Sequence, residues 1–323
     1  MIIKSRINTS LIYLFLLSLL TVSCEYKELT DMDNIGDYKT ISVIFDDSNI
    51  DEVPASMTVA FFPKDKQLIN KDAFIFDIPY YNAEVKLPTN QYAAVTWNNN
   101  TEHIIINNID SYDSYASTGE YSPHGDSMLS HVLDSIYNHQ KVYDFPDYMV
   151  HGFKDDIVIG TESKQIITLP LDSMVTVVNL SIGGIENLSL CYNIRAALNN
   201  LEGTRYMGYY NRTGDMSVVM FDMKAVPDEN RIKASFYVFG CRKDLSHKLT
   251  LFFWLNGGKV YIPLNITDYI SFDGDNKISV NIPSINIDLE KYVKKPDPGD
   301  SDKPGIKVDV DEWGEEEESN ISF

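Results

Sequence analysis

The chain has 323 residues, of which 44% are apolar, and its 47 acidic and 27 basic residues give a net charge of −20. This length and composition favour one large or two medium folded domains and argue against a disordered protein. Because the negative charge repels phosphate backbones, the composition also argues against nucleic acid as a partner.

The first 23 residues have the features of an export signal. Lys4 and Arg6 precede an apolar run over residues 11–20, which is short for a membrane span and about right for a signal h-region. Small residues then lead to Cys24, an arrangement that resembles the lipobox of bacterial lipoproteins. We therefore predict a lipoprotein signal peptide over residues 1–23 and lipidation of the Cys24 thiol. The alternative is an ordinary signal peptide followed by an unmodified cysteine.

The segment after the signal is polar and acidic, and residues 24–38 are predicted to form a lipidated tether. From Lys39 onward, short runs of alternating apolar and polar residues are separated by turn residues, which is typical of antiparallel strands. The expected strands cover residues 39–46, 56–63, 73–78, 82–88, 91–98 and 102–107. The short connections favour a β-sandwich over βαβ units.

One segment has a helical period instead. Starting at Leu129, apolar residues recur at i, i+3, i+4, i+7 and i+8, which makes one stripe on a helix. Asp126 or Ser127 is suited to cap its N-terminus. We predict a short amphipathic helix within residues 127–139, packed on the first sandwich.

A second series of strand signals begins at residue 165. The expected strands cover residues 165–170, 174–182, 188–194, 216–223, 231–240, 247–256, 259–265 and 277–282. Gly257 and Gly258 lie between two of these runs and suit a type I′ hairpin turn. The sequence thus predicts an all-β protein with two sandwiches in tandem, over residues 39–164 and 165–293.

The C-terminal segment, residues 294–323, is predicted to be an acidic linker followed by a terminal strand. Ile306, Val308 and Val310 alternate with polar residues and present one apolar face, which needs a sheet edge to pair with. We expect this strand to dock on its own chain and to cover Trp313 in part. The alternative is an unstructured acidic tail.

A group of histidines and aspartates is a candidate metal site. Its members are His124, His131, His139, His151, Asp126, Asp134, Asp144 and Asp147. His131 and His139 are eight residues apart, whereas two ligands on one helix face stand three or four apart, and the H-E-x-x-H motif is absent. We therefore predict neither a metal site nor a cofactor.

No motif for enzymatic chemistry was found. The sequence lacks the nucleophile elbow, the phosphate-binding loop and the dinucleotide fingerprint, and no pair of catalytic carboxylates can be selected from so many acids. Trp97 and Trp254 lie inside strand patterns and are interpreted as core residues. Cys191 and Cys241 could form a disulfide, but two buried thiols are the preferred interpretation.

Several stretches resemble a known family. They are the lipobox, residues 87–115, FYVFG at 236–240, LFFWLNGG at 251–258 and IKVDVDEWGEEE at 306–317. Together they look like a family of Bacteroidetes lipoproteins of uncharacterised function, similar to the fimbrillin-like proteins of those bacteria. The resemblance implies two transthyretin-like β-sandwiches, with the protein attached to the outer membrane by lipid and exposed at the surface.

The resemblance also implies partners. In fimbrillins a protease removes an N-terminal strand after a basic residue, and a terminal strand of a neighbouring subunit fills the groove. The corresponding residue here is Lys39, a possible processing site where the usual arginine is absent. We therefore predict a non-enzymatic lipoprotein that is a structural, adhesive or anchor component of a fimbrium, with other fimbrial subunits as partners. The alternative is a surface glycan-binding lipoprotein, which would expose aromatic side chains on one face.

Overall fold

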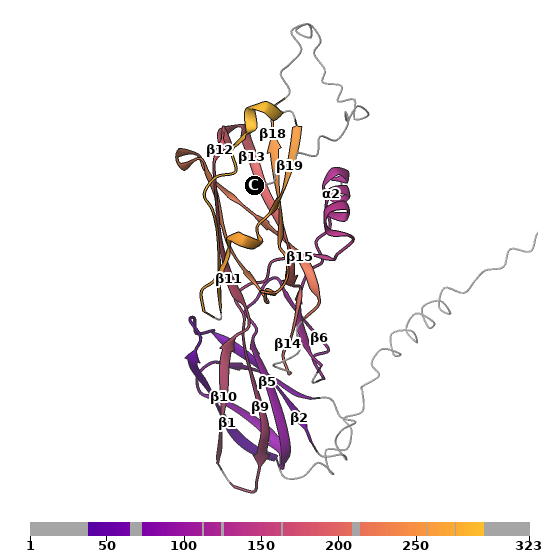
Figure 1. Ribbon diagram of the computed structural model, residues 1–323. Helices are drawn as coiled ribbons and strands as arrows, with labels where there is room; N and C mark the ends of the chain where they lie inside the picture. Colours follow the sequence, from indigo (N-terminus) through magenta and orange to yellow (C-terminus); the bar gives the residue numbers. More distant parts are fainter. Residues whose placement is uncertain are drawn as a thin grey trace, which may run out of the picture.

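The computed structural model describes residues 38–64, 73–111, 113–123, 126–162, 164–208, 214–256, 258–274 and 276–293. Within these ranges the chain is mostly β-strand, and the prediction of an all-β protein is confirmed. Two β-rich bodies, here called the first and the second sandwich, are stacked end to end (Figure 1). In this part of the chain, no helix combines the length and the apolar character that crossing a bilayer requires.

The first sandwich is one seven-stranded sheet that folds over into two layers. In spatial order its strands are β3 (Phe74–Pro79), β2 (Ser56–Pro63), β5 (Asn90–Asn98), β9 (Val150–Ile159), β10 (Gln165–Ser173), β1 (Tyr38–Asn49) and β4 (Ala83–Pro88). The edge strands β3 and β4 are joined by a turn of three residues, so the sheet curves back on itself. Ile41, Val43 and Phe45 of β1 alternate with exposed or half-buried residues and point into the core.

Strands β2 and β5 are buried on both faces, which explains their nearly continuous apolar sequences. One face of each contributes to the core of the first sandwich, for example through Val59 and Tyr92. The other face, with Phe62 and Trp97, packs against the second sandwich. The prediction that Trp97 is a core residue is confirmed, since 4% of its surface is exposed.

The predicted domain boundary at residue 165 is wrong. Strand β10 runs parallel to β1, with Ile41 opposite Gln165, and therefore completes the first sandwich. The chain leaves this sheet after Ser173 and enters the second sandwich at Thr176. Alternation shows that a segment is a strand, but it does not show which sheet receives the strand.

Strand β9 was not predicted because its alternation is interrupted. Asp156 has a φ of 57°, and the pairing register between β5 and β9 shifts between Tyr92 and Ala94. Earlier in the strand, Gly152 lets β9 approach β10 closely, since a Cβ there would lie 2.1 Å from the carbonyl oxygen of Pro170. A bulge and a glycine in one strand remove the two-residue period.

The second sandwich consists of two five-stranded sheets. One sheet has the order β16 (Lys224–Val226), β17 (Arg231–Val238), β11 (Thr176–Gly183), β21 (Lys277–Ile282) and β20 (Ile270–Phe272). The other has the order β19 (Gly258–Asn265), β18 (Lys248–Leu255), β13 (Cys191–Glu202), β15 (Met216–Asp222) and β8 (Val142–Asp144). Their inner faces enclose one core, to which Leu180 and Ile194 contribute from opposite sheets.

Short elements complete the fold. The strands β12 (Ile185–Glu186) and β22 (Ile287–Asp288) pair with each other, and β14 (Thr204–Tyr206), β7 (Tyr115–Thr118) and β6 (Ile104–Asn107) form a three-stranded sheet. The 3₁₀ turns are η2 (Leu188–Leu190), η3 (Pro227–Glu229), η4 (Thr267–Tyr269) and η5 (Leu289–Tyr292). The hairpin of β18 and β19 is confirmed, but Leu255 pairs with Gly258, so this glycine belongs to the strand and not to the turn.

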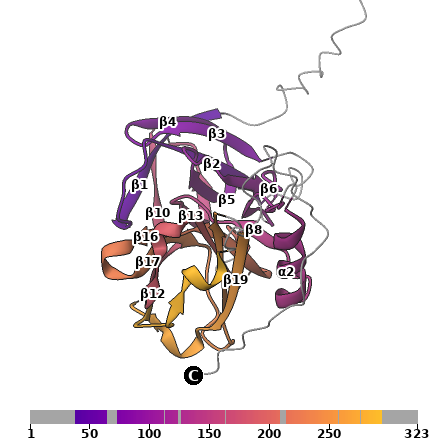
Figure 2. The same ribbon diagram turned by 90° about the horizontal axis from the view of Figure 1, so that it is seen from above.

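The helix α2 (Ser127–Tyr137) forms where it was predicted but packs on the second sandwich, not on the first. It lies outside the body beside β19 (Figure 2). Its stripe covers Ala197, Met220 and Phe252 on the outer face of the β13, β15 and β18 sheet. The apolar stripe predicts a helix that packs on an apolar face, but it does not identify the sheet that provides this face. Asp126 caps the helix, as predicted, by accepting a hydrogen bond of 3.1 Å from the Leu129 amide.

Half-buried Trp254 lies at the edge of this helix interface, so its interpretation as a core residue is wrong. It projects from the outer face of β18, and its ring lies 6.4 Å from that of Phe252. Cys191 and Cys241 are both free thiols, but both are half-buried, so the preferred interpretation of two buried thiols is wrong in the extent of burial.

Replacing Tyr137 by phenylalanine is expected to destabilise the protein by about 1–3 kcal/mol. The buried hydroxyl donates to the carbonyl oxygen of Ala197 at 2.7 Å and lies 2.8 Å from the hydroxyl of Thr250, which the change would leave without this partner. Urea unfolding measures the effect. The matched control is Tyr192→Phe, because Tyr192 is 68% exposed. Equal losses in the two variants would contradict the prediction.

Candidate functional site

The histidines and aspartates of the candidate metal site lie in separate parts of the structure. Asp126 caps α2 and pairs with Lys259 at 2.7 Å, while His139 lies 3.7 Å from Asp134 at the end of that helix. His151 is buried in β9, and His124 lies outside the described residues. In the described ranges, no three His, Cys, Asp or Glu side chains lie close enough together to hold a metal ion. The absence of a metal stays a prediction.

Besides the longer path from β5 to β8, which includes β6, β7 and α2, two short segments carry the chain across the junction between the sandwiches. Residues 145–149 lead from β8 to β9, and residues 173–176 lead from β10 to β11. The Met174 amide donates to the Met149 carbonyl at 2.8 Å, so the two crossings are hydrogen-bonded to each other. Both methionine side chains are fully buried.

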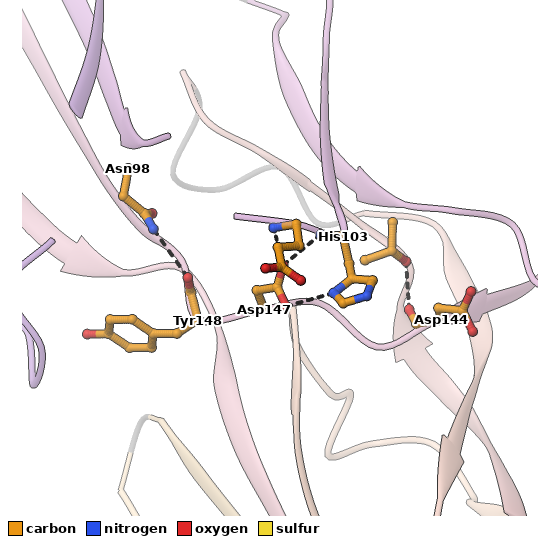
Figure 3. A network of polar contacts seen from close by, with 7 residues as sticks. Asn98, His103, Asp144, Asp147 and Tyr148 are labelled. Carbon is orange, nitrogen blue, oxygen red and sulfur yellow. Dashed lines mark hydrogen bonds and ion pairs between the residues drawn. The ribbon is translucent and has the colours of Figure 1, made fainter. Parts of the chain in front are cut away.

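A polar network holds the first crossing in place (Figure 3). The carboxylate of Asp147 accepts hydrogen bonds from the backbone amides of Glu102 and His103, both at 2.7 Å, and from His103 Nδ1 at 2.8 Å. The hydrogen bond to Asp147 raises the pKa of His103. Burial alone would raise the pKa of Asp147, but the bonds from His103 and Glu102 lower it overall. A charge-assisted contact therefore joins the 102–103 turn to the crossing.

Asn98, at the end of β5, extends the same network. Its Oδ1 accepts from the Val150 amide at 2.9 Å, and its Nδ2 donates to the Tyr148 carbonyl at 3.3 Å (Figure 3). On the other side of Asp147, the hydroxyl of Thr118 donates to the Asp144 carbonyl at 2.6 Å. Side chains from two strands thus form hydrogen bonds with backbone amide and carbonyl groups in and beside this irregular segment. Without these side chains, those backbone groups would have no such partner.

The junction also has an apolar core of its own, here called the junction cluster. Its buried members are Ala60, Phe62, Val95, Trp97, Ala116, Met149, Met174, Val175, Met207 and Phe239. They come from the first sandwich, both crossings, the three-stranded sheet and the residues that follow β14 and β17. This core contains side chains from both sides of the junction. We therefore expect the two sandwiches to behave as one elongated body.

The two ends of this body receive opposite ends of the chain. Tyr38 begins β1 at the end where β9 turns into β10, and the second crossing lies at the other end of β10. In the second sandwich Glu202 lies at the junction end of β13, whereas Cys191 at its other end pairs with Leu255. η5, which ends at Tyr292, lies beside this far end (Figure 1). The chain therefore enters at the outer end of the first sandwich and leaves at the outer end of the second.

Two residues are predicted to be modified, Cys24 by lipidation and Lys39 by proteolytic processing after it. Cys24 and the segment 294–323 lie outside the described residues. Lys39 is the second residue of β1, half-buried and opposite Leu87 of β4. A protease could cut after Lys39 only where this pairing is open, and processing there stays a prediction.

One arrangement beside the junction looks catalytic at first. The Sγ atom of Cys241 lies 3.7 Å from Nε2 of His247, the spacing of a thiol and its base. However, burial, followed by the nearby Glu202 charge, raises the pKa of Cys241 to about 12. The two ring nitrogens of His247 already face the carbonyl oxygens of Asn199 and Arg242, at 3.1 and 2.9 Å. The thiol is therefore protonated and a poor nucleophile.

A family model described as "Domain of unknown function (DUF5119)" matches residues 23–222, more than half of the chain. The chain belongs to the DUF5119 family. The match begins one residue before Cys24 and ends in β15, so the DUF5119 region includes the first sandwich and the junction.

A curated relative of this DUF5119 chain is the "Putative fimbrium anchoring subunit Fim4B" of Bacteroides ovatus, 28% identical over 200 residues. The alignment covers 58% of this chain and 56% of the relative, so the chain spans just over half the length of that protein.

Two solved structures share the fold. A "putative adhesin" from Bacteroides ovatus superposes with a TM-score of 0.59 at 18% identity, over 77% of this chain and 94% of that one. A structure described as "putative polysaccharide binding proteins (DUF1812)" from Bacteroides thetaiotaomicron gives 0.50 at 14% identity, over 77% and 93%. The similarity to fimbrial and adhesin-type proteins of Bacteroidetes, expected from the sequence, is confirmed. The transthyretin-like topology of each sandwich stays a prediction.

Proposed function

We propose that this protein is a lipid-anchored, non-enzymatic anchor subunit of a fimbrium. The observation that carries the proposal is the direction of the chain through the body. The chain enters at the outer end of the first sandwich and leaves at the outer end of the second. The tether of residues 24–38 can reach at most about 50 Å when fully extended. This reach would hold the first sandwich near the membrane and leave the second sandwich facing away from it.

The relative's name supports the anchoring role, and the rigid junction suits it. An anchor must pass the pull on a fibre to the membrane without separating its own domains. The hydrogen-bonded crossings and the junction cluster provide a continuous path between the two sandwiches. Partner subunits would then meet the free end of the second sandwich, and strand addition is one mode available to a β protein.

Cys24→Ala is expected to abolish fatty-acid attachment and to release the protein from the membrane fraction, or to leave it unprocessed, because the diacylglycerol is joined to this thiol and the next cysteine in the sequence is Cys191. Stable membrane attachment requires more than one acyl chain, which lipoprotein processing supplies. Metabolic labelling with an alkyne fatty acid measures this result, with Cys191→Ala as the matched control. Label retained in the Cys24 variant would refute the anchor.

The orientation can be tested by photo-crosslinking in cells that assemble fimbriae. A photoreactive amino acid at Tyr192, beside the far end of the second sandwich, is expected to capture a fimbrial subunit. The same group at Ile166, near the outer end of the first sandwich where β10 begins, should not, although Tyr192 and Ile166 are similarly exposed at 68% and 65%. Capture from Ile166 but not from Tyr192 would reverse the proposed orientation.

A further inference from the structure

A pocket of about 160 Å³ lies beside the junction and has no part in the proposed anchoring. It is bounded by the second crossing, the junction end of β13, the segment after β17 and the turn between β20 and β21. The side chains used in the argument below are Thr176, Glu202, Arg205, Lys243, Phe272 and Asn276. The pocket therefore combines charged, neutral polar and aromatic groups.

Glu202 is a buried acid that lines this pocket. It is 5% exposed, and its backbone amide donates to the Gly240 carbonyl at 2.9 Å. A Cβ at position 240 would lie 2.7 Å from the carboxyl carbon of Glu202, so only glycine lets the carboxylate lie against the backbone there. Burying a carboxylate costs free energy unless the carboxylate is paired. A buried carboxylate that lines a pocket therefore suggests a role in binding.

Arg205 pairs with this acid and also fixes it to the junction. Its Nη1 lies 3.3 Å from Glu202 Oε2 and donates to the Phe239 carbonyl at 2.9 Å. Among the described residues, the carboxylate accepts from Arg205 and from the backbone of Gly214, whereas a carboxylate has about four acceptor positions. Acceptor capacity therefore remains for a hydroxyl group in the pocket.

The charges disfavour a simple ion as ligand. Glu202 opposes an anion, while Arg205 and Lys243 oppose a cation. A neutral molecule with several hydroxyl groups can instead donate to the carboxylate and accept from the guanidinium and the ammonium. Thr176 and Asn276 add neutral hydrogen-bonding groups at the rim.

The aromatic side chain and the volume of the pocket further restrict the chemical class of the ligand. Phe272 lines the pocket, and the Lys243 ammonium lies 4.7 Å from the centre of its ring. Because the Lys243 ammonium lies over the Phe272 ring, only the part of the ring that it leaves open can contact the apolar C–H groups of a sugar, while the sugar hydroxyls suit the charged side of the pocket. A dry cavity of about 150 Å³ accepts a benzene ring, which has half as many heavy atoms as a hexose, so this pocket can hold part of one pyranose ring and leave its other hydroxyl groups in solvent.

We propose that this pocket binds a neutral monosaccharide, such as the terminal residue of a glycan. The protein would then carry a carbohydrate site beside the junction, close to the middle of the body and independent of its lipid anchor. Such a site would let an anchoring subunit recognise sugar at the surface to which it is attached.

Binding of D-galactose, D-mannose and N-acetyl-D-glucosamine to the full chain can be measured by saturation-transfer NMR and titration. At least one of these sugars is expected to bind saturably, with millimolar affinity. Lys243→Met should weaken that binding about tenfold, since a charged donor is lost. Lys243→Arg should restore most of it. Lys248→Met is the matched control, because Lys248 is also exposed but lies on β18, away from the pocket.

The opposite results are equally clear. If none of the three sugars saturates, or if Lys243→Met and Lys248→Met weaken binding equally, the pocket is not a sugar site. Saturable binding of inorganic phosphate that depends on Lys243, without binding of sugar, would identify an anion site and overturn the proposal. Loss of lipidation in the Cys24 variant leaves all these results unchanged, so the two proposals can fail separately.

Discussion

Replacing Trp97 by alanine is expected to destabilise the protein by about 3–5 kcal/mol, the usual cost of removing a buried tryptophan. Its side chain is 4% exposed and belongs to the junction cluster. It stands opposite Thr58 of β2 and His151 of β9, so the cavity would open between the two sandwiches. Urea unfolding of the full chain measures the loss.

Trp254→Ala is the matched control for this change. Trp254 is half-buried at the edge of the helix interface, far from the junction cluster, and its truncation should cost clearly less. The Trp97 variant should also become more sensitive to proteolysis at the crossing of residues 173–176. If both variants lose the same stability and neither crossing is cut, the junction does not have the structural role assigned to it.

Strand positions could be predicted because they depend on local alternation. The expected strand at 56–63 coincides with β2, and the one at 82–88 differs from β4 by one residue. In each case one or both faces are buried and turn residues flank the run. Strand β9 escaped prediction because its bulge at Asp156 and its glycine at 152 interrupt the period.

The arrangement of the strands and the polar site depends on contacts between distant residues. Asp147 and His103 are 44 residues apart, and nothing near either one indicates that they meet. Glu202 is one acid among 47 in the sequence, and only the fold shows that it is buried against Gly240. The helix could be predicted because its apolar stripe and its N-cap lie within one short segment. The sheet on which it packs is formed by distant parts of the chain and could not be predicted in this way.

Acid is expected to weaken the fold through His151. Its side chain is fully buried at the junction face of β9, and burial, followed by the positive charge of Arg205, lowers its pKa from 6.5 to about 4. The opposing influence is Asp172, which stands opposite His151 on β10 and favours the charged form. The folded protein therefore keeps this imidazole neutral over a range in which the unfolded chain protonates it.

The sign of the pH dependence follows from this difference. Between pH 6.5 and about pH 4 the unfolded state binds one more proton than the folded state, so the free energy of unfolding falls as the pH falls. Above pH 6.5 both states are neutral at this residue and its contribution is constant. A difference of 2.5 pKa units corresponds to about 3 kcal/mol lost over this window.

His151→Gln removes the titrating group while keeping a neutral polar side chain, so it should flatten this part of the stability profile. The variant is expected to be less stable than the wild type at pH 7, because glutamine fills the site less well. The difference between the two proteins should shrink or reverse by about 3 kcal/mol at pH 4. Urea unfolding at a series of pH values measures both curves, and His139→Gln, at an exposed position after α2, is the matched control. Parallel curves for wild type and His151→Gln would mean that His151 has the same pKa in the folded and the unfolded protein, against the burial and the charge of Arg205 that the structure places around it.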